Sequence, residues 1–240
     1  MKLRNTVLIV GAVVMAALVQ TAQATTTLGD LISGNGTVTD GNLTFSDFGF
    51  SSSQDTAELT ADADSLIVTS YLGGGAHGGV PGAIYLDFSG FIGVNNSGSS
   101  SLIGDLKLTY TVTASPGSIN YIDQQYTPNA VPTSGQIIIG ETVAYQGNNV
   151  ANSTLTLTPT DLSDPKAEAG DNLYVNPSEN VLNVVKDISI AANGGDLVGL
   201  SDVEQSFHPV PEPTTVIAGV LLLLPLGAST IRILRRNRIG

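Results

Sequence analysis

Apolar and polar residues alternate strictly in Leu106-Lys107-Leu108-Thr109-Tyr110-Thr111-Val112-Thr113. Successive side chains of a β-strand point to opposite faces, so Tyr110 shares one face with the leucines and Val112, and Lys107 shares the other with the threonines. This is the pattern of a strand with one face in a hydrophobic core and one face in water. The chain is therefore expected to contain a sheet that is buried on one side.

Similar short segments recur between turns that contain Gly, Asn or Pro, and we predict a strand for each of them: Thr37–Thr39, Leu43–Phe50, Leu66–Ser70, Ile84–Ser89, Ile137–Tyr145, Thr154–Thr158, Val181–Ile190 and Val198–Phe207. Asp40-Gly41 predicts a hairpin turn between the first two. The helical signal is limited to a turn at Leu28–Ile32. Regularly spaced short strands predict an all-β chain folded as a β-sandwich, immunoglobulin-like or jelly-roll-like. The Gly-, Ser- and Asn-rich segment Val94–Ser101 leaves a division into two small sandwiches near Asn95 open.

Lys186 conflicts with the pattern of its own segment. It shares parity with Leu182, Val184, Ile188 and Ile190, which form an otherwise apolar row. Our first interpretation is an edge strand protected by an inward-pointing lysine, or a β-bulge. A buried ion pair is the second interpretation, and a lysine that contacts a ligand is the third.

The N-terminal 24 residues have the three parts of a secretory signal peptide. Lys2 and Arg4 precede the apolar segment Val7–Val19, and small residues stand at Ala22 and Ala24. This pattern predicts cleavage after Ala24. The apolar segment is shorter than the roughly 20 residues of a spanning helix, which disfavours the alternative of an uncleaved anchor. The chain contains no Cys, so an exported domain would fold without disulfides.

The C-terminal segment, residues 209–240, has the features of a membrane anchor. Pro211-Glu212-Pro213 precedes residues 214–231, which carry no charge, and four arginines follow: Arg232, Arg235, Arg236 and Arg238. Eighteen residues are long enough to span the hydrocarbon layer as a helix. The arginines would stay in the cytoplasm, which places residues 25–208 outside it. A buried helix of a soluble core is the alternative.

These C-terminal features resemble the PEP-CTERM sorting signal of Gram-negative bacteria. The resemblance covers the last 32 residues and is strengthened by the signal peptide at the other end. It implies that exosortase recognises Pro211, Glu212 and Pro213, and that Arg235 and Arg236 form the basic end. It also implies an inner-membrane precursor that is processed and released to the cell surface or the exopolysaccharide matrix. Signal peptidase and exosortase would be the processing partners.

Charge excludes one class of partner. Six of the nine basic residues lie in the two terminal segments, and all 21 acidic residues lie between Asp30 and Glu212. That stretch contains only three lysines, so its formal charge is 3 − 21 = −18. Nucleic acid binding needs clustered Lys and Arg, so we predict no nucleic acid partner. Anionic polymers would be repelled as well, unless divalent cations intervene.

Catalytic motifs are lacking. The stretch Gly73–Gly79 contains His77, but no Lys or helical pattern follows it, so it does not predict a phosphate-binding loop. We interpret it as a flexible loop, or otherwise as a tip that contacts a ligand. Neither His77 nor His208 accompanies a nucleophile elbow. We therefore predict no catalytic residues and no enzymatic activity.

Two weak binding signals remain. Asp62, Asp64, Asp161, Asp164 and Asp171 offer hard oxygen ligands for calcium, without the spacing of an EF-hand loop. Solvated acidic loops are the other interpretation, so calcium is the one cofactor that we leave open. Sugars often bind to aromatic platforms, and five tyrosines could serve as one or lie in the core instead: Tyr71, Tyr85, Tyr121, Tyr126 and Tyr145.

Our leading hypothesis from the sequence is a noncatalytic, exported structural or adhesive protein. The alternative is a carbohydrate-binding module for exopolysaccharide, with or without calcium. A concave face lined by exposed Tyr and Asp would favour the carbohydrate-binding module. A flat face covered by Ser and Thr would favour the structural role.

Overall fold

The computed structural model describes residues 26–54, 59–74, 79–130, 134–163 and 171–210 of the 240-residue chain. The predicted signal peptide, with Ala22 and Ala24, and the predicted sorting signal from Pro211 to Arg236 lie outside these ranges. Within the described part of the chain, no helix is both long enough and apolar enough to cross a membrane.

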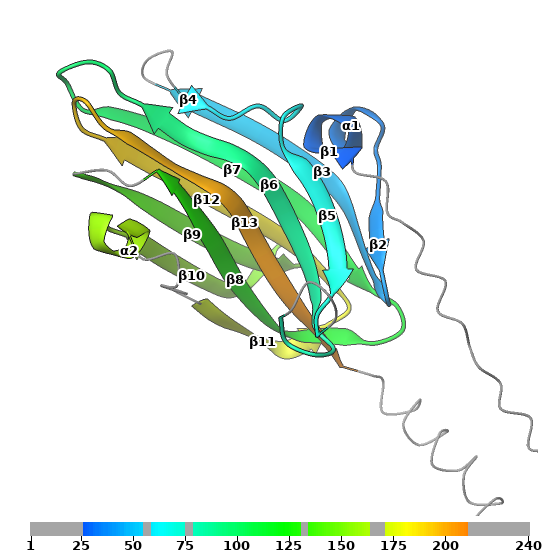
Figure 1. Cartoon of the computed structure of the whole chain (residues 1–240). Coiled ribbons are helices and arrows are strands. Elements are labelled where there is room, and N and C mark those ends of the chain that lie inside the picture. Colours follow the sequence, from blue (N-terminus) through cyan, green and yellow to red (C-terminus); the bar gives the residue numbers. More distant parts are fainter. Residues whose placement is uncertain (1–25, 55–58, 75–78, 131–133, 164–170, 211–240) are drawn as a thin grey trace, which may run out of the picture.

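Two antiparallel sheets form the protein (Figure 1). The seven-stranded sheet contains, in spatial order, β1 (Thr26–Thr27), β5 (Ile67–Leu72), β6 (Ile84–Asn95), β13 (Leu197–Val210), β8 (Ser118–Ala130) and β11 (Asp171–Glu179), and β4 (Leu59–Thr60) also pairs with β6. The six-stranded sheet contains β10 (Asn148–Leu157), β9 (Gly135–Tyr145), β12 (Val181–Ala192), β7 (Leu102–Ala114), β3 (Leu43–Gln54) and β2 (Val38–Asp40). The predicted all-β sandwich is confirmed.

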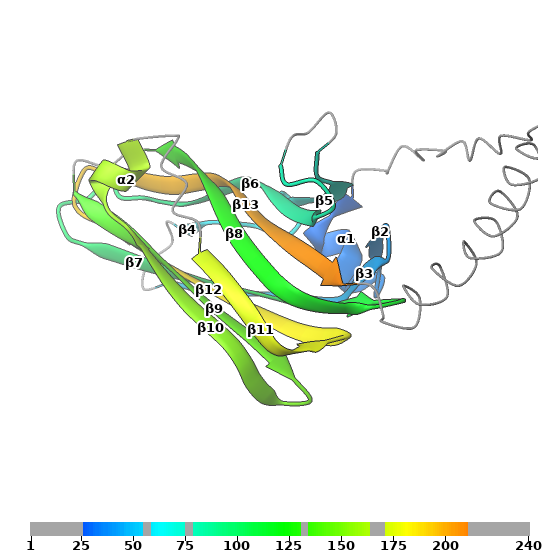
Figure 2. The same ribbon diagram turned by 90° about the horizontal axis from the view of Figure 1, so that it is seen from below.

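The sheets pack face to face as two layers and approach one another at one edge, where β11 lies between β8 and β10 (Figure 2). Two short helices complete the described residues, α1 (Leu28–Ser33) and α2 (Pro159–Ser163). The turn predicted at Leu28–Ile32 is therefore a helix. Thr27 caps it, because its Oγ1 accepts a hydrogen bond of 3.1 Å from the backbone N–H of Asp30.

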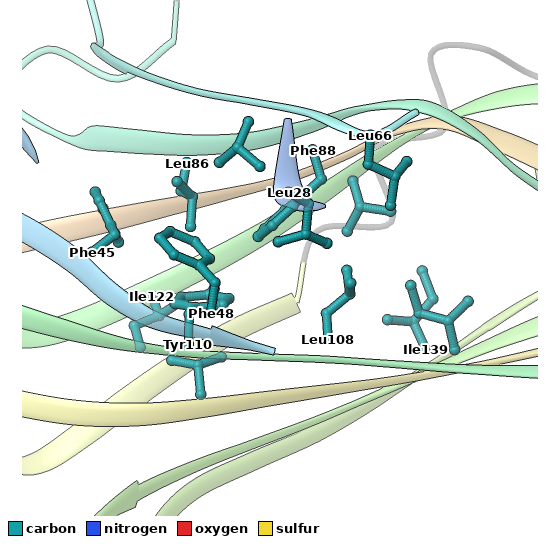
Figure 3. Close-up of a cluster of buried hydrophobic side chains, with 14 of the residues drawn as sticks. Leu28, Phe45, Phe48, Leu66, Leu86, Phe88, Leu108, Tyr110, Ile122 and Ile139 are labelled. Carbon is teal, nitrogen blue, oxygen red and sulfur yellow. The ribbon is translucent and has the colours of Figure 1, made fainter. Parts of the chain in front are cut away.

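The core lies between the inner faces of the two sheets (Figure 3). The alternating stretch in β7 behaves as predicted, because Leu106, Leu108, Tyr110 and Val112 are all buried. Leu28 of α1 reaches the same core and lies beside Phe88 in the view of Figure 3. Core residues come from both sides of Asn95.

The predicted hairpin at Asp40-Gly41 connects β2 to β3. Asp40 pairs with Leu43, and Gly41 adopts a φ of 56°. A positive φ is costly for residues with a Cβ, which explains glycine at this turn.

Our first interpretation of Lys186 is wrong and the second is right. The strand β12 is not at an edge: it lies between β7 and β9. Lys186 is 0% exposed, and its Nζ lies 2.8 Å from Oε2 of Glu141, the residue directly opposite on β9. Parity within one segment cannot show which residue of a distant strand faces it, so the sequence did not reveal this partner.

The ion pair belongs to a buried polar network between the sheets. Lys186 also donates a hydrogen bond of 2.9 Å to Oε1 of Gln124. Gln205 donates to the second carboxylate oxygen of Glu141 and accepts from the hydroxyl of Tyr110. Burial, and next the Glu141 carboxylate, raise the pKa of Tyr110 well above its usual value, so this phenol stays a donor.

Candidate functional site

The two sheets present outer faces of different chemistry. On the six-stranded sheet the pairing register aligns Ser51, Lys107, Asp187, Gly140 and Thr154 in one row across five strands. A groove of about 620 Å³ hollows this face, and Asp105 and Ser189 also line it. Gly140 contributes no side chain, which leaves space between its neighbours in the row. Serine and threonine make up half of the residues that line the groove, and the lining includes no tyrosine.

Tyrosines gather on the outer face of the seven-stranded sheet. Tyr71 of β5 pairs directly with Tyr85 of β6, and Tyr121 of β8 pairs with Tyr174 of β11 and with His208 of β13. These five residues, which we call the tyrosine face, come from five neighbouring strands (Figure 1). With neighbouring strands about 4.8 Å apart, the five strands span about 19 Å.

The aromatic rings of the tyrosine face contact one another in two groups. The rings of Tyr71 and Tyr85 stack with centroids 4.9 Å apart and an interplanar angle of 4°. Tyr121 contacts Tyr174 at 5.2 Å and His208 at 4.5 Å. Tyr174 is 72% exposed and Tyr71 and Tyr121 are partly exposed, whereas Tyr85 is 1% exposed. Tyr71, Tyr121 and Tyr174 are therefore available to a ligand, and Tyr85 supports Tyr71 from the side.

The Gly-rich segment explains why Tyr85 is buried. The backbone N–H of Val80 donates a hydrogen bond of 2.8 Å to the Tyr85 hydroxyl. A Cβ on Gly73 or Gly79 would lie 2.7 Å from the Tyr85 ring, so glycine permits this close approach. The two ends of the predicted flexible loop thus pack against the sheet. His77 lies outside the described residues.

Carboxylates accompany the tyrosines. Asp87 of β6 and Glu204 of β13 stand directly opposite one another, with Asp202 close enough to repel both and Asp123 close enough to repel Glu204. Glu204 accepts a hydrogen bond from the Tyr71 hydroxyl, and Asp87 accepts one from Ser89. Burial, and then the neighbouring negative charges, raise the pKa values of both Asp87 and Glu204 above the usual range.

His208 at the other end of the face is neutral near pH 7, because burial lowers its pKa. Its Nε2 lies 3.3 Å from the Ser206 hydroxyl. On the same row, the Tyr121 hydroxyl donates to the side-chain oxygen of Asn172. This end of the tyrosine face therefore combines two exposed aromatic rings with neutral hydrogen-bonding groups.

The five tyrosines that we considered as a platform for sugars fall into two groups in the structure. Tyr71, Tyr85 and Tyr121 lie together on the outer face, whereas Tyr126 and Tyr145 point inward and pack against the core. Tyr174 was not among the candidates from the sequence, because β8 and β11 were not predicted as strands. Their inner rows are short or interrupted by polar residues such as Gln124, so no clear alternation marks them.

Two of the predicted calcium ligands, Asp62 and Asp161, accept hydrogen bonds within local turns. Oδ1 of Asp62 accepts a hydrogen bond of 3.0 Å from the backbone N–H of Asp64. Oδ2 of Asp161 accepts bonds of 2.8 and 2.7 Å from the backbone and hydroxyl of Thr158, which lower the Asp161 pKa. Asp164 and the side chain of Asp171 lie outside the described residues. In the described ranges, no three His, Cys, Asp or Glu residues are arranged to hold a metal ion.

Comparison with known proteins assigns no family. No family model matches the chain, and no curated protein matches it. Among solved structures, it is similar to the module TmCBM61 in complex with β-1,4-galactotriose (13% identity, 65% of this chain, 86% of that chain, TM-score 0.29). It is also similar to the enzymatically active domain of tailspike protein 4 of bacteriophage CBA120 (12% identity, 68% of this chain, 19% of that chain, TM-score 0.28). A third similar structure is the family 11 carbohydrate-binding module from Clostridium thermocellum (9% identity, 66% of this chain, 88% of that chain, TM-score 0.20). These TM-scores are below the range typical of a shared fold, so function has to be argued from the residues of this chain.

Proposed function

We propose that this protein is an exported, noncatalytic β-sandwich that binds carbohydrate through the tyrosine face. The observation that carries the proposal is the grouping of Tyr71, Tyr121 and Tyr174 on one sheet surface with at least part of each ring accessible. The ring faces carry partial negative charge and suit the C–H face of a sugar ring.

Polar side chains beside the rings complete the argument. Asn172, His208 and Ser206 lie on the same rows as the tyrosines, and Asp87 and Glu204 lie on the next row. Sugar hydroxyls are both donors and acceptors, so a mixture of amide, imidazole and carboxylate groups beside an aromatic ring matches them. This combination favours carbohydrate binding over the structural role that was our leading hypothesis from the sequence.

The proposal predicts that Tyr174→Ala and Tyr121→Ala each weaken glycan binding at least tenfold, about 1.4 kcal/mol. A glycan array would first identify an oligosaccharide that the full-length chain retains. Calorimetric titration of that oligosaccharide would then compare the variants in a polyoxyethylene detergent, which carries no sugar.

Thr154→Ala is the matched control, because Thr154 is exposed in the groove of the opposite sheet. It should bind like the unchanged protein. Binding that fell with Thr154→Ala and not with the tyrosine variants would place the site in the groove and contradict the proposal. An array that retained no oligosaccharide would leave the structural or adhesive role as the better function, in keeping with the Ser- and Thr-covered face of the six-stranded sheet.

Sorting is the second part of the proposal, supported by the sequence alone. The domain assignment is a signal peptide (1–24), a secreted β-sandwich (25–208) and a PEP-CTERM segment (209–240). The last described strand, β13, ends at Val210, where it still pairs with Ser118 of β8. A cut beyond Val210 would therefore leave every described strand in the released domain.

Cell fractionation tests the sorting proposal. In cells that contain exosortase, a C-terminal tag should be lost from the protein that reaches the surface or medium. Replacing Pro211, Glu212 and Pro213 by alanine should keep the tag attached and the protein in the inner membrane. An unchanged chain that stably retained its tag in the inner membrane would count against processing.

A further inference from the structure

The tyrosine face has an unusual charge distribution for a surface that binds a neutral ligand. Both lysines within the described ranges belong to the six-stranded sheet, Lys107 on its outer face and Lys186 in the interior. The described residues therefore place no lysine or arginine on the tyrosine face. Four carboxylates lie there, from three strands: Asp87 on β6, Asp123 on β8, and Asp202 and Glu204 on β13.

Asp87 and Glu204 form the centre of this group. They are direct cross-strand neighbours on the same face, an arrangement in which like charges destabilise a sheet. Both residues are only partly exposed, and burial raises the cost of keeping their carboxyl groups ionised. Oδ1 of Asp87 is buried and has no hydrogen-bond partner in the structure. Because that oxygen is out of reach of a surface ligand, positive charge beside the pair would stabilise it by electrostatic attraction and not by direct contact with that atom.

The aromatic rings determine which cationic ligand fits. The Tyr71 hydroxyl donates to Glu204, so its ring lies directly beside the carboxylate pair. An ammonium group is attracted both to carboxylates and to the face of a tyrosine ring. A bare metal ion would instead require several oxygen ligands in one shell, and the described residues hold no such group.

From this geometry we infer that the tyrosine face binds a polysaccharide that carries free amino groups, with an ammonium beside Asp87 and Glu204 and a sugar ring on Tyr71. This inference rests on the proposed carbohydrate binding and specifies the charge of the ligand. Uronic acid polymers are excluded by the same carboxylates, because a second negative charge would have to be desolvated beside them.

Calorimetric titration of the full-length chain with three oligosaccharides of equal length tests the inference: glucosamine oligomers, N-acetylglucosamine oligomers and galacturonic acid oligomers. At pH 6 and low salt, the glucosamine oligomer should bind at least tenfold more tightly than its acetylated counterpart. The galacturonic acid oligomer should bind most weakly. The preference for the amine should fall as salt is added, because the carboxylates are partly exposed and are screened.

Glu204→Gln and Asp87→Asn should each remove most of the preference for glucosamine over the acetylated oligomer, because each removes one of the two negative charges beside the ammonium. Asp105→Asn is the matched control, because it removes a carboxylate from the outer face of the other sheet. It should leave the preference unchanged. A preference that survived both Glu204→Gln and Asp87→Asn would overturn the inference.

Acidification should also remove the preference. Because the folded-state pKa values of Asp87 and Glu204 are raised, these groups become neutral at a higher pH than ordinary carboxylates as the pH falls from neutral. Protonation of His208 as the pH falls would add positive charge to the face, whereas Tyr71, with its raised pKa, stays neutral. The ammonium itself keeps its charge, so the loss would report on the protein.

The remaining outcomes separate this inference from the proposed function. If the acetylated oligomer bound as tightly as the amine, and Tyr174→Ala weakened both, carbohydrate binding would stand and the charge preference would be wrong. If none of the three oligomers bound while another glycan did so through the tyrosines, the inference would also fail alone. Binding that a chelator abolished and calcium restored would replace the ammonium by a metal ion and overturn it.

Discussion

Lys186→Met is expected to lower the free energy of unfolding by about 3–5 kcal/mol, because it leaves a buried carboxylate without its counter-charge. Glu141 is 1% exposed and would keep only the hydrogen bond from Gln205. Oε1 of Gln124 would lose its donor as well, although its amide still donates to Ser153 at 3.2 Å. Methionine has a similar volume to lysine, so the loss would report on charge and hydrogen bonding and not on a cavity.

Urea denaturation measured by circular dichroism checks this result. Lys107→Met is the matched control: Lys107 lies on β7, next to β12 in the same sheet, but is exposed on its outer face. That variant should change the free energy of unfolding by no more than about 0.5 kcal/mol. Equal losses for the two variants would show that Lys186 is not the buried partner of Glu141.

A double variant separates the uncompensated charge from the lost lysine. Adding Glu141→Gln to Lys186→Met removes the buried negative charge and keeps an oxygen that accepts from Gln205. Part of the stability should return, since neutral replacements of both members of a buried pair cost less than removal of one. A double variant no more stable than Lys186→Met would contradict the electrostatic explanation.

Phe207→Ala is expected to cost about 3–5 kcal/mol, in the range for removal of a buried phenylalanine. Phe207 lies on β13, in the middle of the seven-stranded sheet, and is 0% exposed. Its ring contacts Phe45 of the opposite sheet at 5.3 Å and Tyr110 at 6.4 Å. Truncation would open a cavity where aromatic rings of the two sheets meet.

The matched control is Tyr174→Ala, an aromatic truncation on the outer face of the same sheet. Tyr174 is 72% exposed, so this variant should stay within about 0.5 kcal/mol of the unchanged protein in the same urea titration. The pair therefore separates stability from binding: Phe207 is needed for the fold, and Tyr174 is needed for the proposed ligand. A large loss of stability from Tyr174→Ala would mean that its ring has a structural role.

Strands with a clean alternation of apolar and polar residues were predictable from the sequence. The apolar row of β7 and the hairpin from β2 to β3 are examples, because strand period and turn chemistry are local properties. The strand β8 was missed because Gln124 occupies an inward position, and β11 was missed because its apolar row is short. The inward Gln124 is tolerated through its hydrogen bond with Lys186, which is a property of paired strands and not of any one of them.

The candidate site, too, could be predicted from the sequence only in part. Tyr71, Tyr85 and Tyr121 could be named as aromatic candidates, but Tyr126 and Tyr145 could not be distinguished from them. Which tyrosines share a surface depends on sheet order: β5, β6, β13, β8 and β11 are neighbours in space and widely separated along the chain. No residue near Tyr71 in the sequence indicates that Tyr121 and Tyr174 lie on the same face.

Residue composition and local periodicity alone determined that this chain is all-β and acidic outside its ends, and they predict an export signal and a C-terminal anchor. Those properties depend on side chains that are near one another in sequence, where hydrophobic period, turn preference and charge can be read directly. The pairing of Lys186 with Glu141, and the union of tyrosines and carboxylates on one outer face, were decided by the tertiary structure. Both arise from the register of distant strands, since hydrogen bonding between neighbouring strands sets which side chains meet.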